Sequence, residues 1–235
     1  MTRRIVLDTE TTGLDPALGH RIIEVGCVEL RGRQLTQHRF HSYINPERAI
    51  DAGAMQVHGI TDERVADEPV FAKVAGELLD FIRGAELVIH NAAFDVGFLD
   101  AEFERLGLGK VAGHCPTVTD TLKMAREMRP GRRNSLDALC KDFGIDNSGR
   151  QLHGALLDAE LLAEVYLAMT RGQESLVMEL DVPVAMAAVG TGKRLPLRVL
   201  CASEEELAAH ERVLGEIAKE SKGNCLWPVE PSGSA

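Results

Sequence analysis

Four acidic residues and one histidine of this chain have the types and the settings of a phosphodiester-cleaving metal site. Asp8 and Glu10 lie in IVLDTETTGL, Asp95 lies in VIHNAAFDVGFL, and His153 and Asp158 lie in RQLHGALLDAELL. An acid beside apolar residues is costly unless it is paired or binds a cation. A shared cation is therefore the simplest explanation of the set, and it predicts phosphodiester cleavage assisted by two metal ions.

Asp8 and Glu10 lie two residues apart at the end of an apolar segment. A strand is expected over residues 4–8, and the alternation of side chains along a strand places both carboxylates on one face. Turn residues follow, so the pair is expected at the exposed carboxyl end of that strand. An Asp-x-Glu pair alone is weak evidence, since two solvated acids at a sheet edge have the same pattern.

Asp95 and Asp158 each interrupt the buried side of an amphipathic helix. Asp95 does so in a helix expected over residues 93–106, and Asp158 does so in a helix expected over residues 155–169. An acid in the first helical turn can also simply complement the helix dipole, and this alternative stays open for each residue taken alone. Two such acids, together with the pair on the strand, favour a shared cation.

The donor types indicate which metal such a site would hold. Carboxylates without a thiolate or a multi-histidine set select Mg²⁺ or Mn²⁺ rather than zinc. His153 precedes Asp158 by five residues and is followed by Gly154, so it is expected on a loop at the mouth of the helix. From there its imidazole can take a proton from the attacking water near neutral pH. Because like charges repel, loss of Asp8 or Asp158 is expected to leave the metal-free protein at least as stable.

Composition and charge limit the class of protein. The chain has 235 residues, with 26 basic and 36 acidic side chains and a net charge of −10, whereas a protein that grips long duplex DNA alone is usually basic. Aromatic residues make up 4% of the chain, too few for an extended base-stacking platform. A nucleic-acid substrate is therefore expected to make a short, metal-bridged contact or to depend on a partner protein.

The chain is expected to be cytoplasmic and to have no contact with a membrane. It contains no apolar run of about 18 residues, and its first residues become acidic too soon for a secretory signal. Its five cysteines include no CxxC pair, which favours reduced thiols.

Strands and helices are expected in an order that defines the fold class. Strands are expected over residues 4–8, 22–30, 35–44, 86–90 and 117–121, and helices over 70–82, 93–106 and 155–169. Three strands in quick succession imply an antiparallel start, and strands then alternate with helices. The sequence therefore predicts an α/β fold with a mixed sheet and helices on both faces.

The chain is expected to divide into a catalytic domain, a linker and a small tail. The domain covers residues 1–171, the linker covers 172–194, and the tail covers 195–235. Within the tail, a strand is expected over 195–202 and a helix over 204–219, which Ser203 and Glu206 begin as a capping box. A unit of about 40 residues without disulfides or metal ligands is near the lower limit for folding alone, so the tail is expected to dock on a partner.

Three segments resemble the motifs of a known enzyme family. DTETTGL, NAAFD and HGALLDA are similar to the motifs of the histidine-type DEDD exonucleases, which share a ribonuclease-H-like fold, and the similarity covers about residues 4–170. The resemblance implies that two Mg²⁺ or Mn²⁺ ions are held by Asp8, Glu10 and Asp158, with Asp8 shared. It also implies that Asp95 completes the acidic set and that His153 is the general base. The implied reaction removes nucleoside monophosphates one at a time from the 3′ end of single-stranded or frayed DNA.

Further segments resemble one branch of that family, the proofreading subunits of bacterial replicative DNA polymerases. They are VHGITDE, PGRRNSLDALCKDFGID, and the tail segments SEEELAAHERVL and GNCLW. The resemblance implies that residues 195–235 bind the catalytic subunit of the polymerase. Trp227, the single tryptophan, is a candidate anchor because tryptophan is enriched at interface hot spots, and a tryptophan packed within the tail itself is the alternative.

Other residues are candidates for contacts with the substrate. Thr11 and His58, together with the metal-binding acids, are expected near the terminal nucleotide, and for His58 this rests on the resemblance. The densest basic run either steers the DNA backbone toward the site or is a solvated face, and it consists of Lys123, Arg126, Arg129, Arg132 and Arg133.

Gln173, Leu176 and Met178 resemble the Gln-x-x-Leu-x-aromatic peptides that bacterial proteins insert into the sliding clamp. Met178 replaces the aromatic residue, so a weak contact is expected, which tethering through the polymerase would reinforce. A chance hexapeptide at a helix end is the alternative.

Two other functions stay open at this point. A stand-alone 3′–5′ exoribonuclease or oligonucleotidase would use the same chemistry, but it would not need a tethered tail. A non-catalytic interaction subunit of the replication machinery could retain the fold, but it would gain nothing from clustered acids.

Overall fold

The structure is a computed structural model that describes residues 2–150, 152–171 and 202–221. The chain separates into two units, residues 1–177 and 178–235, and each is described by itself. The predicted catalytic, metal-binding and substrate-binding residues all belong to the first unit, so its sheet and helices are the elements that position them.

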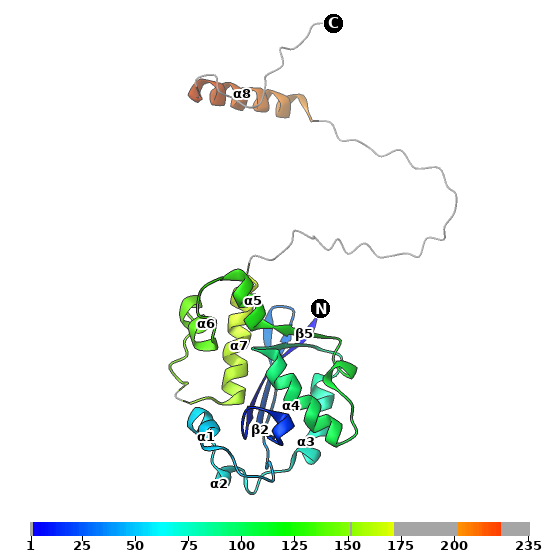
Figure 1. Ribbon diagram of the computed structural model, residues 1–235. Coiled ribbons are helices and arrows are strands. Elements are labelled where there is room, and N and C mark those ends of the chain that lie inside the picture. The colour runs from blue at the N-terminus through cyan, green and yellow to red at the C-terminus, as the bar shows by residue number, and fades with distance from the viewer. Residues whose placement is uncertain (1, 151, 172–201, 222–235) are drawn as a thin grey trace, which may run out of the picture. The chain divides into compact units, whose positions relative to one another are not determined.

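A mixed five-stranded sheet forms the centre of the first unit (Figure 1). Its strands are β1 (Arg3–Thr11), β2 (Ile22–Arg31), β3 (Gln34–Tyr43), β4 (Glu86–Ile89) and β5 (Thr117–Asp120), in the spatial order β3-β2-β1-β4-β5. β2 pairs antiparallel with both β1 and β3, whereas β4 is parallel to β1 and to β5. The predicted α/β class with a mixed sheet is confirmed.

Helices connect and cover these strands. They are η1 (Pro16–Leu18), α1 (Ala52–His58), α2 (Asp62–Val65), α3 (Phe71–Ile82), α4 (Ala92–Arg105), η2 (Val111–Gly113), α5 (Thr121–Met128), α6 (Leu136–Phe143) and α7 (Ala155–Met169). Helices α3, α4 and α7 match the three predicted helices, because apolar residues recur in each at helical spacing.

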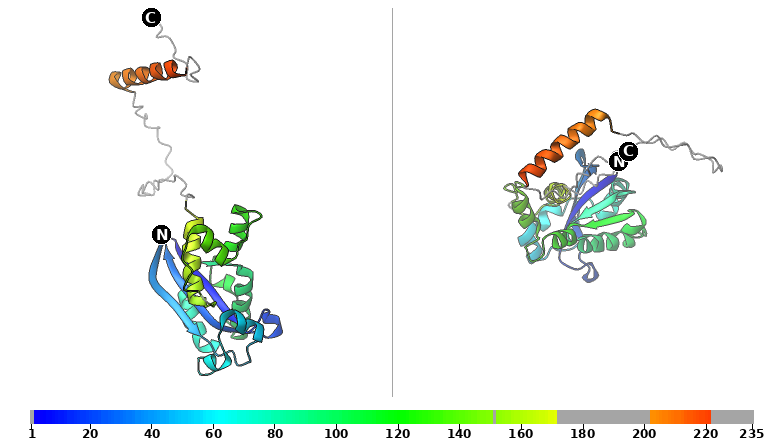
Figure 2. Two further views of the ribbon diagram at one scale, coloured as in Figure 1. Left: turned by 90° about the vertical axis from the view of Figure 1, so that its left-hand side faces the viewer. Right: turned by 90° about the horizontal axis from the view of Figure 1, so that it is seen from above.

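Both faces of the sheet are covered, so alternate residues of one strand enter different cores. Ile5 and Leu7 of β1 pack with apolar residues of α3 and α4, whereas Val6 between them packs with residues of α5, α6 and α7. Figure 2 shows the helices on either side of the sheet. β2 is covered from both sides, which explains why it is buried at every residue from Ile22 to Leu30.

The first turn of α7 lies directly against β2 at Gly26. A Cβ atom on this glycine would lie 2.3 Å from the carbonyl carbon of Ala155 and from the amide nitrogen of Leu156, closer than packed atoms can approach. Gly26 is the register partner of Asp8 on β1. The missing side chain therefore allows the start of α7 to approach the sheet beside Asp8.

Glu24 ties the same helix to the sheet. Its buried carboxylate accepts a hydrogen bond from the backbone amide of Ala155 at 3.2 Å and contacts His41 Nε2 at 2.7 Å. An acid at this position also complements the dipole of the helix. The missing side chain at Gly26 and the hydrogen bond to Glu24 together fix where α7 begins.

The described part of the second unit is helix α8 (Glu204–Glu220). The predicted capping box begins it, because the Ser203 hydroxyl accepts from the Glu206 amide at 3.3 Å and the Glu206 carboxylate accepts from the Ser203 amide at 2.8 Å. The linker predicted over 172–194, and all but the last residue of the strand predicted over 195–202, lie outside the described residues. Within the described part of the chain, no helix is long and apolar enough to cross a membrane.

Gly26→Ala is expected to destabilise the protein by about 1–3 kcal/mol, the usual cost of forcing an extra methyl group into a packed contact. Gly97→Ala is the matched control, because Gly97 lies in α4 with no atom within 4 Å of its Cβ position, and alanine favours a helix by about 0.5–1 kcal/mol. Urea unfolding of both variants measures the difference. An unchanged stability of Gly26→Ala would show that α7 can shift without cost.

Candidate active site

Asp8 and Glu10 lie inside β1 on the face that carries α7. The strand continues as far as Thr11, because its pairing with β2 continues to Ile22, so the pair lies near the carboxyl end of the strand as predicted. The prediction that this end is exposed is wrong, because Glu10 is only 8% exposed. The alternation of side chains along the strand places both acids on the face of Val6, which packs with residues of α7.

Asp95 reaches the same strand from the opposite helical layer. Its Oδ1 atom accepts hydrogen bonds from the backbone amide of Thr9 at 3.1 Å and from the Thr9 hydroxyl at 2.7 Å. Asp95 lies in the first turn of α4, which begins after Asn91 in the left-handed conformation, with φ at 64°. It is 3% exposed, so its predicted place on the buried side of the helix is confirmed.

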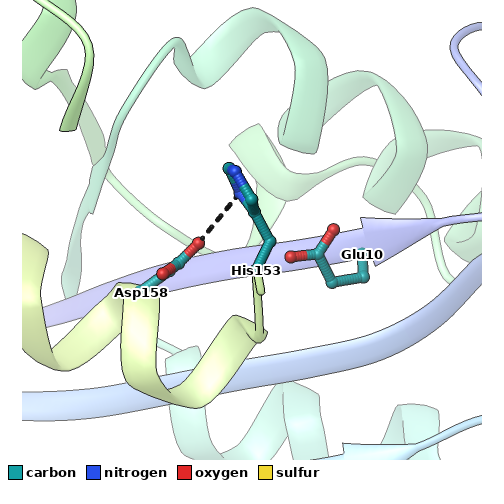
Figure 3. Close-up of side chains that lie close together, drawn as sticks. All are labelled: Glu10, His153 and Asp158. Atoms are coloured by element: carbon teal, nitrogen blue, oxygen red, sulfur yellow. Dashed lines mark ion pairs between the residues drawn. The ribbon is translucent and has the colours of Figure 1, made fainter. Parts of the chain in front are cut away.

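Asp158 and His153 come from α7 and from the loop that precedes it. Asp158 lies in the first turn of the helix and is buried, as predicted. His153 Nδ1 is 3.3 Å from Asp158 Oδ2, and Glu10 approaches the same pair from β1 (Figure 3). Potential ligand atoms of Glu10, His153 and Asp158 all lie within 4.8 Å of one another. The fold thus brings together side chains from the two ends of the first unit.

The carboxylates are close enough to change one another's protonation. Burial, and then the charges of Asp95, Glu10 and Asp158, raise the pKa of Asp8 well above its usual value. Burial, and then the charge of Asp158, raise the pKa of Glu10 to about 8. Burial raises the pKa of Asp95 to about 7, against hydrogen bonds that lower it. Without a cation, Glu10 therefore holds a proton near neutral pH and Asp95 is partly protonated, while the pKa of Asp8 is raised in the same direction.

Arg150 places a positive charge inside this acidic group. Its guanidinium donates to both carboxylate oxygens of Asp158, with Nη2 2.6 Å from Oδ2, and Nη1 donates to Oδ1 of Asp137 at 2.6 Å. Burial alone would raise the pKa of Asp158, but its contacts with His153 and Arg150 hold that pKa below its usual value. Arg150 is not predicted from the sequence, although it lies three residues before His153 in the same segment.

The donor set fits a divalent cation. Carboxylates and one imidazole converge in the described part of the chain, and this combination of hard oxygen and nitrogen donors suits Mg²⁺ or Mn²⁺. The guanidinium against Asp158 shows that the group accommodates positive charge.

Two cavities meet at the acidic group. One, of about 690 Å³, is lined by residues of α5, by Arg132 and by the start of α6, and the other, of about 560 Å³, is lined by residues of α1 such as Val57. Asp8 and His153 line both cavities. A chain that passes from one cavity to the other would therefore cross the acids.

Thr11 and His58, the predicted substrate contacts, line the second cavity. His58 is buried and its Nδ1 atom accepts a hydrogen bond from the amide of Ile60 at 3.0 Å. Burial lowers the pKa of His58, so it offers a neutral imidazole rather than a charge.

The basic run is divided by the fold. Arg126 and Arg132 line the first cavity, whereas Arg129 forms an ion pair with Asp142. A role of the run in steering DNA stays a prediction. The predicted clamp and polymerase contacts lie outside the described residues, and these are Gln173, Leu176, Met178 and Trp227.

Comparison with known sequences places these features in a family. The model of the exonuclease family RNase_T matches residues 5–166. DNA polymerase III subunit epsilon of Pasteurella multocida is 54% identical, over 96% of this chain and 93% of its own length. The protein of the same name from Escherichia coli is 52% identical, over 97% of this chain and 98% of its own length.

Solved structures agree with the sequence comparison. Exonuclease X in complex with 5′ overhanging duplex DNA superposes with a TM-score of 0.57 at 27% identity, over 71% of this chain and 90% of that chain. The zinc-bound complex of Escherichia coli exonuclease I with single-stranded DNA has a TM-score of 0.65 at 20% identity, over 74% of this chain and 41% of that chain. At this lower identity the likeness shows the fold alone.

The raised pKa values predict how the stability of the metal-free protein depends on pH. In the unfolded chain, Glu10 and Asp95 have pKa values of about 4. In the folded chain, the pKa of Glu10 is about 8 and that of Asp95 is about 7. Between these values the folded state binds more protons, so the free energy of unfolding falls as the pH rises. Glu10→Gln should remove part of this fall in the free energy of unfolding. Its thermal midpoint in EDTA should therefore exceed that of the wild type at about pH 8 but not at about pH 5.

Asp158→Asn is the matched control with the opposite sign. It removes the charge that pairs with Arg150, so the metal-free variant should be less stable at both pH values. The gain in stability that repulsion alone predicts for loss of Asp158 is therefore no longer expected. Superimposable melting profiles of the wild type and Glu10→Gln across this range would contradict the raised pKa of Glu10.

Proposed function

The chain belongs to the family of DNA polymerase III epsilon subunits, and we propose that it cleaves the terminal phosphodiester of a DNA 3′ end with two divalent cations and with His153 as general base. It is a proofreading 3′–5′ exonuclease, with an exonuclease domain over residues 5–166 and relatives that match almost the whole chain. The observation that carries the mechanism is the convergence of Glu10, His153 and Asp158 within 4.8 Å where two cavities meet.

Asp8, Glu10 and Asp158 would hold the cations, with Asp8 shared between them. Two Mg²⁺ or Mn²⁺ ions supply positive charge that stabilises the attacking and the leaving oxygen of an in-line displacement. The raised pKa values of Asp8 and Glu10 support this role, because these acids lack the counter-charge that would keep them ionised. Asp95 would complete the acidic set, and its hydrogen bonds to Thr9 keep its carboxylate beside β1.

His153 would accept the proton of the attacking water. The water oxygen bonds to phosphorus while the bond from phosphorus to the 3′ oxygen of the preceding nucleotide breaks. The products are a nucleoside 5′-monophosphate and a new 3′ end, whose oxygen receives a proton. His153 suits this role because it is exposed, lines both cavities and lies beside Asp158. A carboxylate that accepts from one imidazole nitrogen orients the ring and leaves the other nitrogen free.

The terminal nucleotide would enter the second cavity. Thr11 and His58 line it, and Leu14 and Val57 add apolar side chains that are 85% and 49% exposed. Exposed apolar groups of this kind favour contact with an unstacked base, so a frayed end should bind better than a paired one. The preceding phosphates would lie along the first cavity, which Arg126 and Arg132 line.

The relation to the epsilon subunits includes the tail. The exonuclease family model ends at residue 166, whereas the relatives named epsilon match 96% and 97% of the chain. A stand-alone exoribonuclease would not need this shared tail, and a non-catalytic subunit would not need the acids. The full-length match therefore favours a nuclease associated with the polymerase III complex, which acts on DNA in the cytoplasm.

Two contacts within that complex are proposed from the sequence. Residues 195–235 would bind the catalytic alpha subunit with Trp227 as an anchor, and the segment of Gln173, Leu176 and Met178 would bind the sliding clamp weakly. Helix α8 supports a docked tail, because it leaves large apolar side chains exposed for a partner to cover, namely Leu207, Val213 and Ile217.

His153→Ala should slow the removal of 3′-terminal nucleotides by about 10²–10⁴-fold, the usual contribution of a positioned general base, while metal binding persists. Asp8→Ala, which removes the shared ligand, should lose several orders of magnitude. Labelled DNA and RNA of matched sequence, digested with Mg²⁺, measure the rates. Near-wild-type hydrolysis by Asp8→Ala, or faster digestion of RNA, would overturn the assignment.

Truncation after residue 185 and Leu176→Ala should have complementary effects. The truncated protein should lose binding to the alpha subunit but keep its affinity for the clamp, whereas Leu176→Ala should bind the alpha subunit and lose clamp affinity. Both should hydrolyse DNA at the wild-type rate, because the acids lie in the first unit. Surface plasmon resonance with each partner measures the affinities. Binding of the truncated protein to the alpha subunit at full affinity would refute the role of the tail.

A further inference from the structure

Arg150 engages the carboxylate of Asp158, which is one of the proposed metal ligands. Its side chain is 6% exposed, and the Asp158 carboxylate that it meets is 4% exposed. Nη2 is 2.6 Å from Asp158 Oδ2, and Nε donates to the other oxygen of the same carboxylate. Both oxygens of a predicted metal ligand are therefore occupied by one guanidinium, the two-pronged geometry in which arginine binds carboxylates best.

A divalent cation at Asp158 would have to compete with this contact. The guanidinium and the cation carry charges of the same sign, so they repel each other at ion-pair distance. They would also share the same two carboxylate oxygens. Metal binding at Asp158 is therefore weakened as long as Arg150 keeps both contacts, and it favours release of the arginine.

The same guanidinium determines which ring nitrogen of His153 acts as a hydrogen-bond acceptor. Nη2 lies 2.9 Å from His153 Nδ1, and because a guanidinium only donates, Nδ1 must accept in this arrangement. A neutral imidazole then carries its proton on Nε2, which leaves no free nitrogen to take a proton from water. If Arg150 leaves, Nδ1–H can donate to Asp158 Oδ2, which is 3.3 Å away, and Nε2 becomes the free base.

Asp137 offers the displaced arginine a second partner. Its Oδ1 atom already accepts from Arg150 Nη1 at 2.6 Å, and its carboxylate is 59% exposed at the start of α6. Asp137 and Arg150 both line the first cavity. The arginine can thus turn away from Asp158 into this cavity and still keep an ion pair.

We propose that Arg150 is an internal latch: it occupies the metal-free site, holds His153 in the tautomer that cannot act as a base, and is displaced when divalent cations bind. The latch couples metal binding to the tautomer of His153, so that the metals bind and the free Nε2 atom is formed together. It rests on the metal site proposed above and adds a positioning role for a residue outside the acidic set.

Calorimetric titration of Mn²⁺ into the metal-free, full-length protein tests the latch. Arg150→Gln should bind Mn²⁺ at least about fivefold more tightly than the wild type, because two unit charges about 4 Å apart repel by about 1 kcal/mol even at the dielectric constant of water, and Mn²⁺ carries two. Arg126→Gln is the matched control, because it removes the same charge from the wall of the same cavity without an ion pair among the described residues. Its affinity should change by less than about twofold, since exposed charges at longer range are screened.

The outcomes separate the latch from the metal site itself. If the wild type binds no Mn²⁺, the proposed metal site fails. If the wild type binds Mn²⁺ and Arg150→Gln binds it equally or more weakly, the latch fails while the metal site stands. Arg150→Lys keeps the charge but not the two-pronged contact, so its affinity should lie between the two. Should Arg150→Gln fail to fold, the affinity of Arg150→Lys decides, and a value no tighter than wild type overturns the latch.

Nitrogen-15 spectra of the imidazole rings give a second readout, with His153→Gln identifying the signal. In EDTA the His153 proton should lie on Nε2, and after addition of Mg²⁺ it should lie on Nδ1. Arg150→Gln should show the Nδ1–H form already in EDTA, whereas Arg126→Gln should behave as the wild type. The same His153 tautomer in the wild type with and without Mg²⁺ would overturn the latch.

Discussion

Repulsion among four carboxylates is the constraint on which the site depends. Free side chains with these charges would move apart, so the fold must hold them together. Asp8 and Glu10 are fixed by β1, which is packed between two helical layers. Asp95 is fixed by its hydrogen bonds to Thr9, and Asp158 by the first turn of α7. Protons on the acids whose pKa is raised, and the positive charge of Arg150, reduce the repulsion that packing has to withstand.

The position of α7 sets the distance between Asp158 and the two acids of β1. Gly26 permits backbone contact between the helix and β2, and Glu24 accepts a hydrogen bond from the first residue of the helix. These two residues are the register partners of Asp8 and Glu10 on the neighbouring strand. A shift of α7 along the sheet would therefore change the distance between the acids of β1 and Asp158, so a packing contact sets the dimensions of the site.

Much of the fold follows from sequence patterns, because they are local. The apolar segments that form β1 and β2 and the helical spacing around Asp158 are readable without partners. The interruption of an apolar face by Asp95 marks it as a site candidate for the same reason. The extension of β1 through Thr11 is not readable, because it depends on pairing with β2. The contact of Glu24 with Ala155 is equally hidden, since the two residues are 131 apart in the chain. The partners of Arg150 are nearer in sequence, but the loop that precedes α7 has no periodic pattern that shows which acid its guanidinium meets.

The net charge of −10 makes most of the surface unfavourable to the phosphates of a 3′ end. Without cations, the acids of the site offer these phosphates no attraction, because they are engaged by protons and by Arg150. The proposed cations would add positive charge at the acids while the rest of the surface stays acidic. Attraction would then be confined to the few phosphates beside the metals, which suits an enzyme that binds a terminus rather than the length of a duplex. A partner that delivers the 3′ end would supply the remaining affinity, because tethering raises the effective concentration to about the millimolar range.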